Sequence, residues 1–329
     1  MSILCSGSFV ADILVPDLPH IGPPGSLTYA PSGIALSPGG HSANVAINLA
    51  QLEAKNVYAV GSIGHDEMGN FLIEQLKNRG VKPLPEIHKD STTAKNVALL
   101  VKGEDRRYIA EFTANSMLTT KHLRASISKV KPSILYQGTL GGLPDIEQNL
   151  PKILDDTRKI GALNFIDVII PSNGWDYLFP ARAFIHILHA NQLEAKSLTG
   201  RSDPHDAIPE LNKAGVKLVI ISDAKHGVIA GTDTHQFEMP AYSVEQRDPT
   251  GAGDALSAGI ISHIQRNRIT LDEITDPETI LQLLLYGQAA GAACVTGLGA
   301  TTAVTMQNVK NILEQQKEQV YGQTRMRKL

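Results

Sequence analysis

Short apolar runs alternate with longer amphipathic segments along most of this 329-residue chain. The short runs are typical of buried β-strands, whereas the amphipathic segments repeat their apolar residues with the period of an α-helix. The predicted strands cover residues 3–6, 57–60, 133–137, 163–167, 185–189 and 217–222. The predicted helices cover residues 42–52, 69–79, 144–159, 206–214, 253–267, 277–295 and 305–319. This alternation predicts an α/β fold with a mostly parallel central sheet and helices on both faces.

Two segments interrupt this alternation. Residues 20–40 are rich in proline and glycine, and residues 92–113 form a strand–turn–strand pattern around Lys102-Gly-Glu-Asp105. A parallel core needs no hairpin, so both segments are expected in a small separate sheet. We therefore assign residues 1–11, 38–90 and 116–329 to an α/β domain, and residues 12–37 and 91–115 to a small β lid. A lid would exclude water from a reaction site; an edge hairpin without a function is the alternative.

The composition excludes several classes of protein. The chain is 42% hydrophobic and 19% charged, and its net charge of −3 provides no broad basic field for nucleic acid. Two cysteines provide no disulfide framework. The first residues lack the basic segment of a signal peptide, and the most apolar long stretch is interrupted by Gln282 and Gln288. We therefore expect a cytoplasmic protein whose main partner is neither nucleic acid nor a membrane.

The stretch Asp248-Pro-Thr-Gly-Ala-Gly-Asp254 precedes a predicted apolar helix. Its small residues expose the backbone N–H groups of Gly251, Ala252 and Gly253, and the positive end of the helix dipole lies behind them. Such a helix start binds anions, yet a carboxylate beside it would repel an anion. This conflict is resolved if Asp254 accepts a proton while the N–H groups stabilise developing charge. The stretch therefore favours transfer of a group, most simply a phosphoryl group, onto a hydroxyl.

Of three other interpretations of the same stretch, one stays open and two fail on sequence. A tight turn with Asp254 as a first-turn acid remains open. A dinucleotide-binding fingerprint would need glycine or alanine where Leu256 stands, after an apolar strand, but residues 245–248 are polar. A P-loop would need Lys-Ser or Lys-Thr after its last glycine, and the sequence has no such stretch.

Polar residues beside predicted strand ends and helix starts are candidates for binding a polyol. Asp12 follows the first strand, and its carboxylate can accept hydrogen bonds from two adjacent hydroxyls. Gly39 and Gly40 permit close approach to the backbone, and Asn44 offers both a donor and an acceptor. An exposed loop aspartate and a helix-capping asparagine are the alternatives.

Two further strand ends carry candidate ligands. Asn191 and Glu194 provide oxygen atoms that suit a hydrated Mg²⁺. Ser222 precedes a turn at Gly227, where a hydroxyl could meet a phosphate; a plain strand-to-turn transition is the alternative. His186 and His189 do not form a metal pair, because their odd spacing on a strand directs them to opposite faces.

In this order and spacing, the motifs resemble those of the PfkB carbohydrate kinases, the ribokinase-like family. Gly39-Gly-x-x-x-Asn44-x-Ala46 is similar to the family's N-terminal signature, continued by Gly61-x-x-Gly64-x-Asp66-x-x-Gly69, and the stretch from Asp248 to Ile261 is similar to its C-terminal signature. Asn191-x-x-Glu194 is similar to a third family motif. The resemblance extends from Gly7 to about Ala300 and implies a ribokinase-like fold.

The resemblance implies a role for each matching residue. Asp254 matches the general base, and Gly251, Ala252 and Gly253 match the anion hole. Substrate-binding positions correspond to Asp12, Gly39, Gly40 and Asn44, with Gln137 or Thr139 in place of a glutamate of ribokinases. ATP-binding positions correspond to Asn191, Glu194, Ser222, Ala224, Gly227, Ala290 and Gly299, with Mg²⁺ held by Glu194 through water. Some members bind a monovalent cation, for which Asp248, Thr250 and Gly299 are candidates here, K⁺ being the expected ion.

Departures from the family pattern affect the substrate and the nucleotide loop. His41 stands where ribokinases have lysine, which puts ribose in doubt, and Ala224 replaces the first glycine of a Thr-x-Gly-x-x-Gly loop whose threonine is Ser222. We expect ATP-dependent phosphorylation of a primary hydroxyl of a small sugar. A nucleoside kinase and a non-catalytic sugar or nucleotide sensor are the alternatives. Because the outer face of a small lid needs cover, a homodimer through the lid is also expected.

Overall fold

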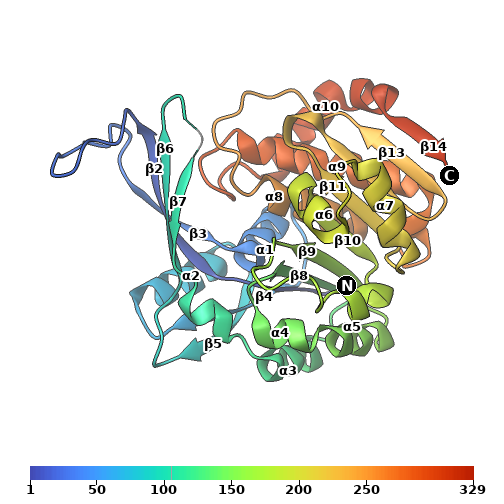
Figure 1. The fold of residues 1–329 in the computed structure, drawn as a ribbon, viewed down its shortest axis with the longest axis horizontal. Coiled ribbons are helices and arrows are strands. Elements are labelled where there is room, and N and C mark those ends of the chain that lie inside the picture. The colour runs from blue at the N-terminus through green and yellow to red at the C-terminus, as the bar shows by residue number, and fades with distance from the viewer. Residues whose placement is uncertain (105) are drawn as a thin grey trace.

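The computed structural model describes residues 1–104 and 106–329 (Figure 1). Asp105, in the predicted hairpin turn, lies outside the described residues. A sheet of ten strands runs through the larger part of the molecule. Neighbouring strands are parallel from one edge through most of the sheet, in the order β5 (Lys82–His88), β4 (Val57–Gly64), β1 (Ile3–Ser6), β8 (Ile134–Leu140), β9 (Leu163–Val168), β10 (Ile187–Asn191) and β11 (Leu218–Ser222). The sheet ends in antiparallel β12 (Val228–Gly231), β13 (His235–Met239) and β14 (Arg325–Lys328).

Two hydrophobic cores lie on opposite faces of this sheet. Along β1, Ile3 and Cys5 belong to one core and Leu4 to the other, because successive side chains of a strand point to opposite faces. The first core is closed by α1 (His41–Gln51), α2 (Glu67–Asn78), α8 (Ala252–Asn267), α9 (Pro277–Val295) and α10 (Met306–Gln323). The second is closed by α3 (Thr120–Val130), α4 (Pro144–Gln148), α5 (Leu150–Lys159), α6 (Gln192–Thr199) and α7 (Pro204–Lys213). Short 3₁₀ helices span Thr113–Met117, Phe179–Phe184, Ala224–His226 and Glu273–Thr275. The predicted α/β fold with helices on both faces is confirmed.

One predicted helix is divided in the structure. Residues 144–159 form α4 and α5, which meet at Asn149. Pro151 lies in the first turn of α5, where its missing N–H group costs nothing, but it cannot continue the hydrogen bonding of a preceding helix.

A smaller sheet projects from one side of the molecule, at the left of Figure 1. Its strand order is β3 (Ala35–Gly39), β2 (Val10–Leu18), β6 (Lys95–Val101) and β7 (Arg107–Ala110). β6 and β7 pair antiparallel, as predicted for the hairpin, whereas β2 and β6 are parallel. The existence of a separate small sheet is therefore confirmed, and its function as a lid with the boundaries given above stays a prediction. Among the described residues, no helix combines the length and apolar character needed to cross a bilayer.

Candidate active site

The residues predicted to form an anion hole lie at the start of α8. Gly251 caps the helix with φ 77°, and a β-carbon at this position would lie 2.2 Å from Ala300 Cβ. Only glycine fits both the left-handed backbone and the close approach. The N–H group of Ala252 points back to the carbonyl of Pro249 over 3.4 Å, a long and weak hydrogen bond. Residues 251–253 therefore form a helix N-terminus that can bind an anion.

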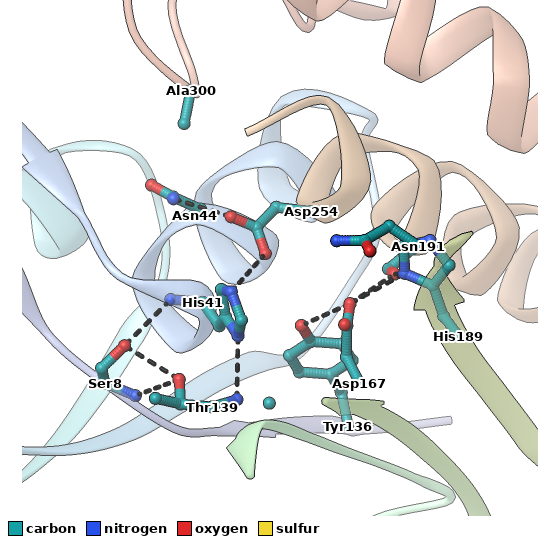
Figure 2. A network of polar contacts seen from close by, with 12 residues as sticks. Ser8, His41, Asn44, Tyr136, Thr139, Asp167, His189, Asn191, Asp254 and Ala300 are labelled. Carbon is teal, nitrogen blue, oxygen red and sulfur yellow. Dashed lines mark hydrogen bonds and ion pairs between the residues drawn. The ribbon is translucent and has the colours of Figure 1, made fainter. Parts of the chain in front are cut away.

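Asp254 follows in the first turn of α8, and its side chain is only 7% exposed. Asn44 Nδ2 donates a hydrogen bond to Oδ2 over 2.8 Å, and His41 Nε2 lies 4.0 Å from Oδ1 (Figure 2). Burial raises the pKa of Asp254, while His41 and Asn44 lower it in part. A carboxylate whose pKa is moved toward neutrality is better suited to take a proton from a hydroxyl.

His41, noted in the sequence only as a departure from a family pattern, is held in place by two residues. Its Nδ1 accepts the backbone N–H of Thr139 over 2.8 Å, and its own backbone N–H donates to Ser8 Oγ over 3.2 Å. A neutral imidazole whose Nδ1 accepts carries its proton on Nε2, the atom that faces Asp254 (Figure 2). His41 thus presents a hydrogen-bond donor to the carboxylate and to any hydroxyl bound beside it.

Asp12 lies on β2 of the smaller sheet, where it pairs in register with Ser37 of β3 and Asn96 of β6. Asn96 Nδ2 donates to its Oδ1 over 3.0 Å, and a β-carbon on Gly39 would lie 1.9 Å from its Oδ2. The pKa of Asp12 is raised to about 6, chiefly by burial and in smaller part by the negative charges of Asp254 and Asp248, while the hydrogen bond from Asn96 lowers it in part. Asp12, on β2 of the smaller sheet, and Asp254, on α8, are thus close enough for the charge of Asp254 to act on Asp12. The pairing of Asp12 with Asn96 was not foreseen, although alternation along the predicted hairpin could have placed Asn96 on the same face.

Two amide oxygens of this region have no partner. Asn44 Oδ1 and Asn96 Oδ1 are buried without a hydrogen bond among the described residues. Buried polar atoms are nearly always paired in folded proteins. A ligand with several hydroxyl donors would supply the missing bonds.

Gln137 is fully buried, and its Nε2 donates to the carbonyl of Gly138 over 2.9 Å. Its Oε1, like the amide oxygens of Asn44 and Asn96, has no hydrogen-bond partner among the described residues. The expectation that Gln137 contacts a substrate stays a prediction. Thr139, the other candidate, instead contributes through His41.

A cavity of about 500 Å³ opens next to the start of α8. Of the predicted nucleotide-binding residues, Asn191, Ser222, Ala224 and Gly227 line it, together with Ala252 and Gly253. Other residues that line the cavity were not predicted from the sequence to bind a nucleotide: Arg106, Lys225, Tyr242, Gln288 and Val295. The cavity therefore extends from the start of α8 to the ends of β10 and β11.

Two of the residues predicted to bind ATP, Ala290 and Gly299, do not line this cavity. Ala290 is fully buried, and its methyl group would meet a β-carbon built on Gly259 of α8. Its neighbours Gly291 and Ala292 line the cavity instead. Gly299 donates its N–H to Asp248 Oδ2 over 2.8 Å and is not part of the cavity wall.

Asn191 and Glu194 form a reciprocal capping box at the start of α6. Asn191 Oδ1 accepts the N–H of Glu194 over 2.9 Å, and Glu194 Oε2 accepts the N–H of Asn191 over 2.7 Å. This spacing is as typical of a helix cap as of a magnesium site. Burial raises the pKa of Glu194. The capping bond occupies one carboxylate oxygen, so the donor set suits a Mg²⁺ ion that keeps most of its waters.

The buried carboxylate of Asp248 links two loops. Its Oδ1 accepts the N–H of Thr250 over 2.9 Å, and its Oδ2 accepts the N–H of Gly299. Tyr108 of β7 meets Thr250 from the smaller sheet, with the two hydroxyl oxygens 3.1 Å apart. The three candidate cation-binding residues are therefore adjacent, and the small sheet touches the loop that leads into the anion-binding helix.

Comparison with known proteins agrees with this geometry. The sequence matches the model of the pfkB family carbohydrate kinases over residues 2–306. It is 24% identical over 326 residues to probable fructokinase-7 of Arabidopsis thaliana, with 94% of this chain and 92% of that protein covered.

Solved structures share the fold. Fructokinase with bound ATP from Xylella fastidiosa superimposes with a TM-score of 0.81 at 24% identity and covers 96% of this chain and 99% of its own. Aminoimidazole riboside kinase from Salmonella enterica, solved with aminoimidazole riboside and an ATP analogue, gives a TM-score of 0.75 at 22% identity and covers 95% and 100%. The chain belongs to the pfkB family of carbohydrate kinases.

Proposed function

We propose that this carbohydrate kinase transfers the γ-phosphoryl group of ATP to a primary hydroxyl of a small sugar, with Asp254 as the general base. The observation that carries the proposal is the position of Asp254. Its buried carboxylate directly follows Gly253, which lines the cavity at the ends of β10 and β11, and it accepts a hydrogen bond from Asn44, whose Oδ1 has no partner among the described residues. A hydroxyl bound beside Asn44 would face a nucleotide phosphate bound in the cavity.

Each residue would contribute to positioning or to charge. Asp12 would accept hydrogen bonds from sugar hydroxyls, and Gly39 and Gly40 would let the sugar approach the backbone. Asp254 would take the hydroxyl proton as the oxygen attacks, while the N–H groups of residues 251–253 stabilise charge on the transferring group. Phosphoryl transfer needs little covalent chemistry from the protein, so this positioning supplies most of the catalysis.

Glu194 and Asn191 would hold Mg²⁺ through water. Bound there, the ion would neutralise charge on the ATP phosphates. Asp248, Thr250 and Gly299 would hold a monovalent cation such as K⁺; activity that is unchanged when K⁺ replaces a large organic cation would contradict this assignment.

We further propose that residues 12–37 and 91–115 act as a lid and as the surface of a homodimer. The contact between Tyr108 and Thr250 supports the first role, because it ties the small sheet to the loop before α8. Exposed apolar side chains on the small sheet or directly beside it support the second, among them Ile34, Leu36 and Ile109. Sedimentation of the wild type and of Ile109→Glu tests the dimer, which the charged variant should dissociate.

The test of the proposed function compares Asp254→Asn with Glu278→Gln in a coupled ATP-consumption assay. The sugar panel includes pentoses, hexoses and ketose phosphates. Loss of a positioned base should lower turnover by roughly 10² to 10⁴ while ATP still binds. Glu278 is an exposed first-turn acid of α9, so its variant controls for a mere helix-dipole effect and should retain full turnover. Equal turnover of the two variants would remove Asp254 from its role.

A nucleoside kinase is the second candidate. Its support is the shared fold of the aminoimidazole riboside kinase and the half-exposed ring of Tyr108, which could pack on a base. Adding nucleosides to the same panel separates the two substrates. A sensor without turnover is disfavoured, because it would have no use for a buried base beside an anion-binding helix.

A further inference from the structure

Two hydroxyl residues hold His41 at the start of α1 (Figure 2). Ser8 follows β1, and Thr139 lies near the end of β8. The hydroxyl oxygens of Ser8 and Thr139 are 2.9 Å apart, and the N–H group of Ser8 also donates to Thr139 Oγ1 over 3.1 Å. His41 is bound to both residues, because its own N–H group donates to Ser8 Oγ and its Nδ1 accepts the N–H group of Thr139. The backbone and the ring of His41 are therefore fixed together.

The N–H group of Thr139 reaches His41 because Thr139 departs from the regular pattern of the sheet. The register between β8 and β1 ends at Gln137, and the register between β8 and β9 shifts between Gln137 and Leu140. Thr139 has φ 59°, a left-handed conformation that is rare for a β-branched residue. Strained backbone of this kind persists where its surroundings impose it, and it is concentrated at functional sites. Here the strained backbone directs its N–H group to His41.

This bond determines which nitrogen of His41 carries a proton. A backbone N–H group can only donate, so Nδ1 must accept, and a neutral ring then has its proton on Nε2. Burial lowers the pKa of His41, but nearby carboxylates, with Asp254 foremost, raise it above its ordinary value. An imidazolium also has a proton on Nε2. Nε2 is therefore a donor whether the ring is neutral or charged.

Nε2 of His41 faces the proposed general base across a gap that suits one oxygen atom. It lies 4.0 Å from Asp254 Oδ1, which is too long for a direct hydrogen bond. A hydroxyl oxygen about 2.8 Å from each atom would bridge the two. This oxygen would accept from Nε2, so its own hydrogen would find no acceptor on His41 and would point to Oδ1. The second carboxylate oxygen, Oδ2, already accepts a hydrogen bond from Asn44.

We propose that His41 is a catalytic residue of the phosphoryl transfer: its Nε2–H group holds the attacking hydroxyl of the sugar and directs the hydroxyl hydrogen to Asp254 Oδ1. The inference rests on the proposed function, since it needs a sugar hydroxyl beside Asp254. The proton of the hydroxyl passes to Asp254 while the oxygen forms a bond to the γ-phosphorus of ATP. The bond from this phosphorus to the bridging oxygen breaks, and ADP leaves. Ser8 and Thr139 act through His41 and are positioning residues.

The first experiment identifies the protonated nitrogen in the unmodified protein, without a ligand. The ¹⁵N shifts of the His41 ring, assigned by comparison with His41→Gln, should show a proton on Nε2 throughout the range from about pH 6 to about pH 9. A neutral ring with its proton on Nδ1 would overturn the proposal, because Nε2 could then only accept.

The second experiment compares the turnover of His41→Leu and His41→Gln with that of the wild type, using the sugar of the panel that gives the highest turnover. Loss of the donor in His41→Leu should lower kcat roughly 10²-fold and leave the KM for ATP unchanged. His41→Gln carries an amide N–H donor and should recover most of this loss. Equal kcat values for His41→Leu and the wild type would overturn the proposal.

His122→Leu is the matched control. His122 is a half-buried histidine on α3 whose Nε2 donates to the carbonyl of Leu84 over 3.0 Å. The variant therefore loses a ring and a hydrogen bond of the same kind, but α3 contributes no residue to the site described above. It should keep the turnover of the wild type.

A sugar analogue separates a contact with the hydroxyl from a structural role of His41. The analogue has hydrogen in place of the hydroxyl that is phosphorylated, so it cannot accept from Nε2. In the absence of nucleotide, His41→Leu should weaken binding of the sugar roughly tenfold and leave binding of the analogue unchanged. Equal weakening of both would overturn the proposal.

Thr139→Val tests the positioning role. It keeps the branched shape and the backbone N–H group but loses the hydroxyl that contacts Ser8. The kcat should fall roughly tenfold, should recover in Thr139→Ser, and should be unaffected by the change in a His41→Leu background. An equal fall in both backgrounds would overturn the positioning role. Absence of turnover of the wild type on every sugar would overturn both the inference and the proposed function, whereas an active wild type with the wrong tautomer of His41 overturns the inference alone.

Discussion

Replacing Asp12 with asparagine should stabilise the protein while weakening its affinity for sugar. Asp12 is 8% exposed, and its pKa is raised by burial from the ordinary 3.8 to about 6. Between these values the folded protein binds more protons than the unfolded chain, so stability falls as the pH rises from about 4 to about 6. At about 1.4 kcal/mol per pH unit, ionised Asp12 costs about 3 kcal/mol above pH 6. Asparagine can still accept the bond from Asn96 but carries no charge.

The assay is chemical unfolding of wild type, Asp12→Asn and Asp17→Asn at several pH values. The advantage of Asp12→Asn should grow by about 2 to 3 kcal/mol between pH 4 and pH 7. Asp17 undergoes the same chemical change on the same strand but is exposed, so its variant should follow the wild type. In kinetic assays Asp12→Asn should raise the sugar KM and leave the ATP KM unchanged. A stability difference that is independent of pH would refute the assigned burial cost, and an unchanged sugar KM would refute the binding role.

Three further changes test other parts of the site. Gly39→Ala would place a methyl group 1.9 Å from Asp12 Oδ2 and should raise the sugar KM roughly tenfold or more. Because the clash is with the Asp12 side chain, the increase in KM should nearly vanish in an Asp12→Ala background. An equal increase in both backgrounds would contradict a clash with Asp12. Ala224→Gly should raise the free energy of unfolding by about 0.5 kcal/mol. The change relieves the strain of alanine in a left-handed backbone (φ 45°), about 1–2 kcal/mol, but increases the entropy of the unfolded chain, which costs about 0.4–1 kcal/mol. Denaturant unfolding measures the difference, and a variant less stable than the wild type would count against strain at Ala224. Glu194→Gln should increase the Mg²⁺ concentration for half-maximal activity by roughly tenfold, whereas superimposable Mg²⁺ titrations would argue for a purely capping role with Asn191.

The fold class could be predicted because it rests on local periodicity. Apolar runs of strand length and amphipathic segments of helical period follow from the backbone geometry of each element alone. The same holds for the start of α8, since residues 251–253, which we propose to bind an anion, and Asp254 are contiguous. One turn of helix is enough to bring them together.

Side-chain orientation within buried elements could not be predicted in the same way. α9 is apolar on nearly every side, so its sequence marks no face toward the cavity; of the helical stretch around the predicted Ala290, Gly291 and Ala292 line the cavity and Ala290 does not. In β8 the pairing register shifts between Gln137 and Leu140, and Thr139 has φ 59°. That irregularity breaks the alternation of side chains and separates Thr139 from Gln137.

By itself, the sequence determined the kind of elements, the α/β class and the helix start that can bind an anion, because each depends on residues adjacent in the chain. Only the tertiary structure decided which residues surround Asp254 of α8. These are Asn44 and His41 from α1 and Asp12 from the smaller sheet. It likewise decided the contact of Ser8 with Thr139 and of Thr139 with His41. These neighbours are set by strand order and register, which are global results of packing two cores against one sheet and are not encoded in any short stretch of residues.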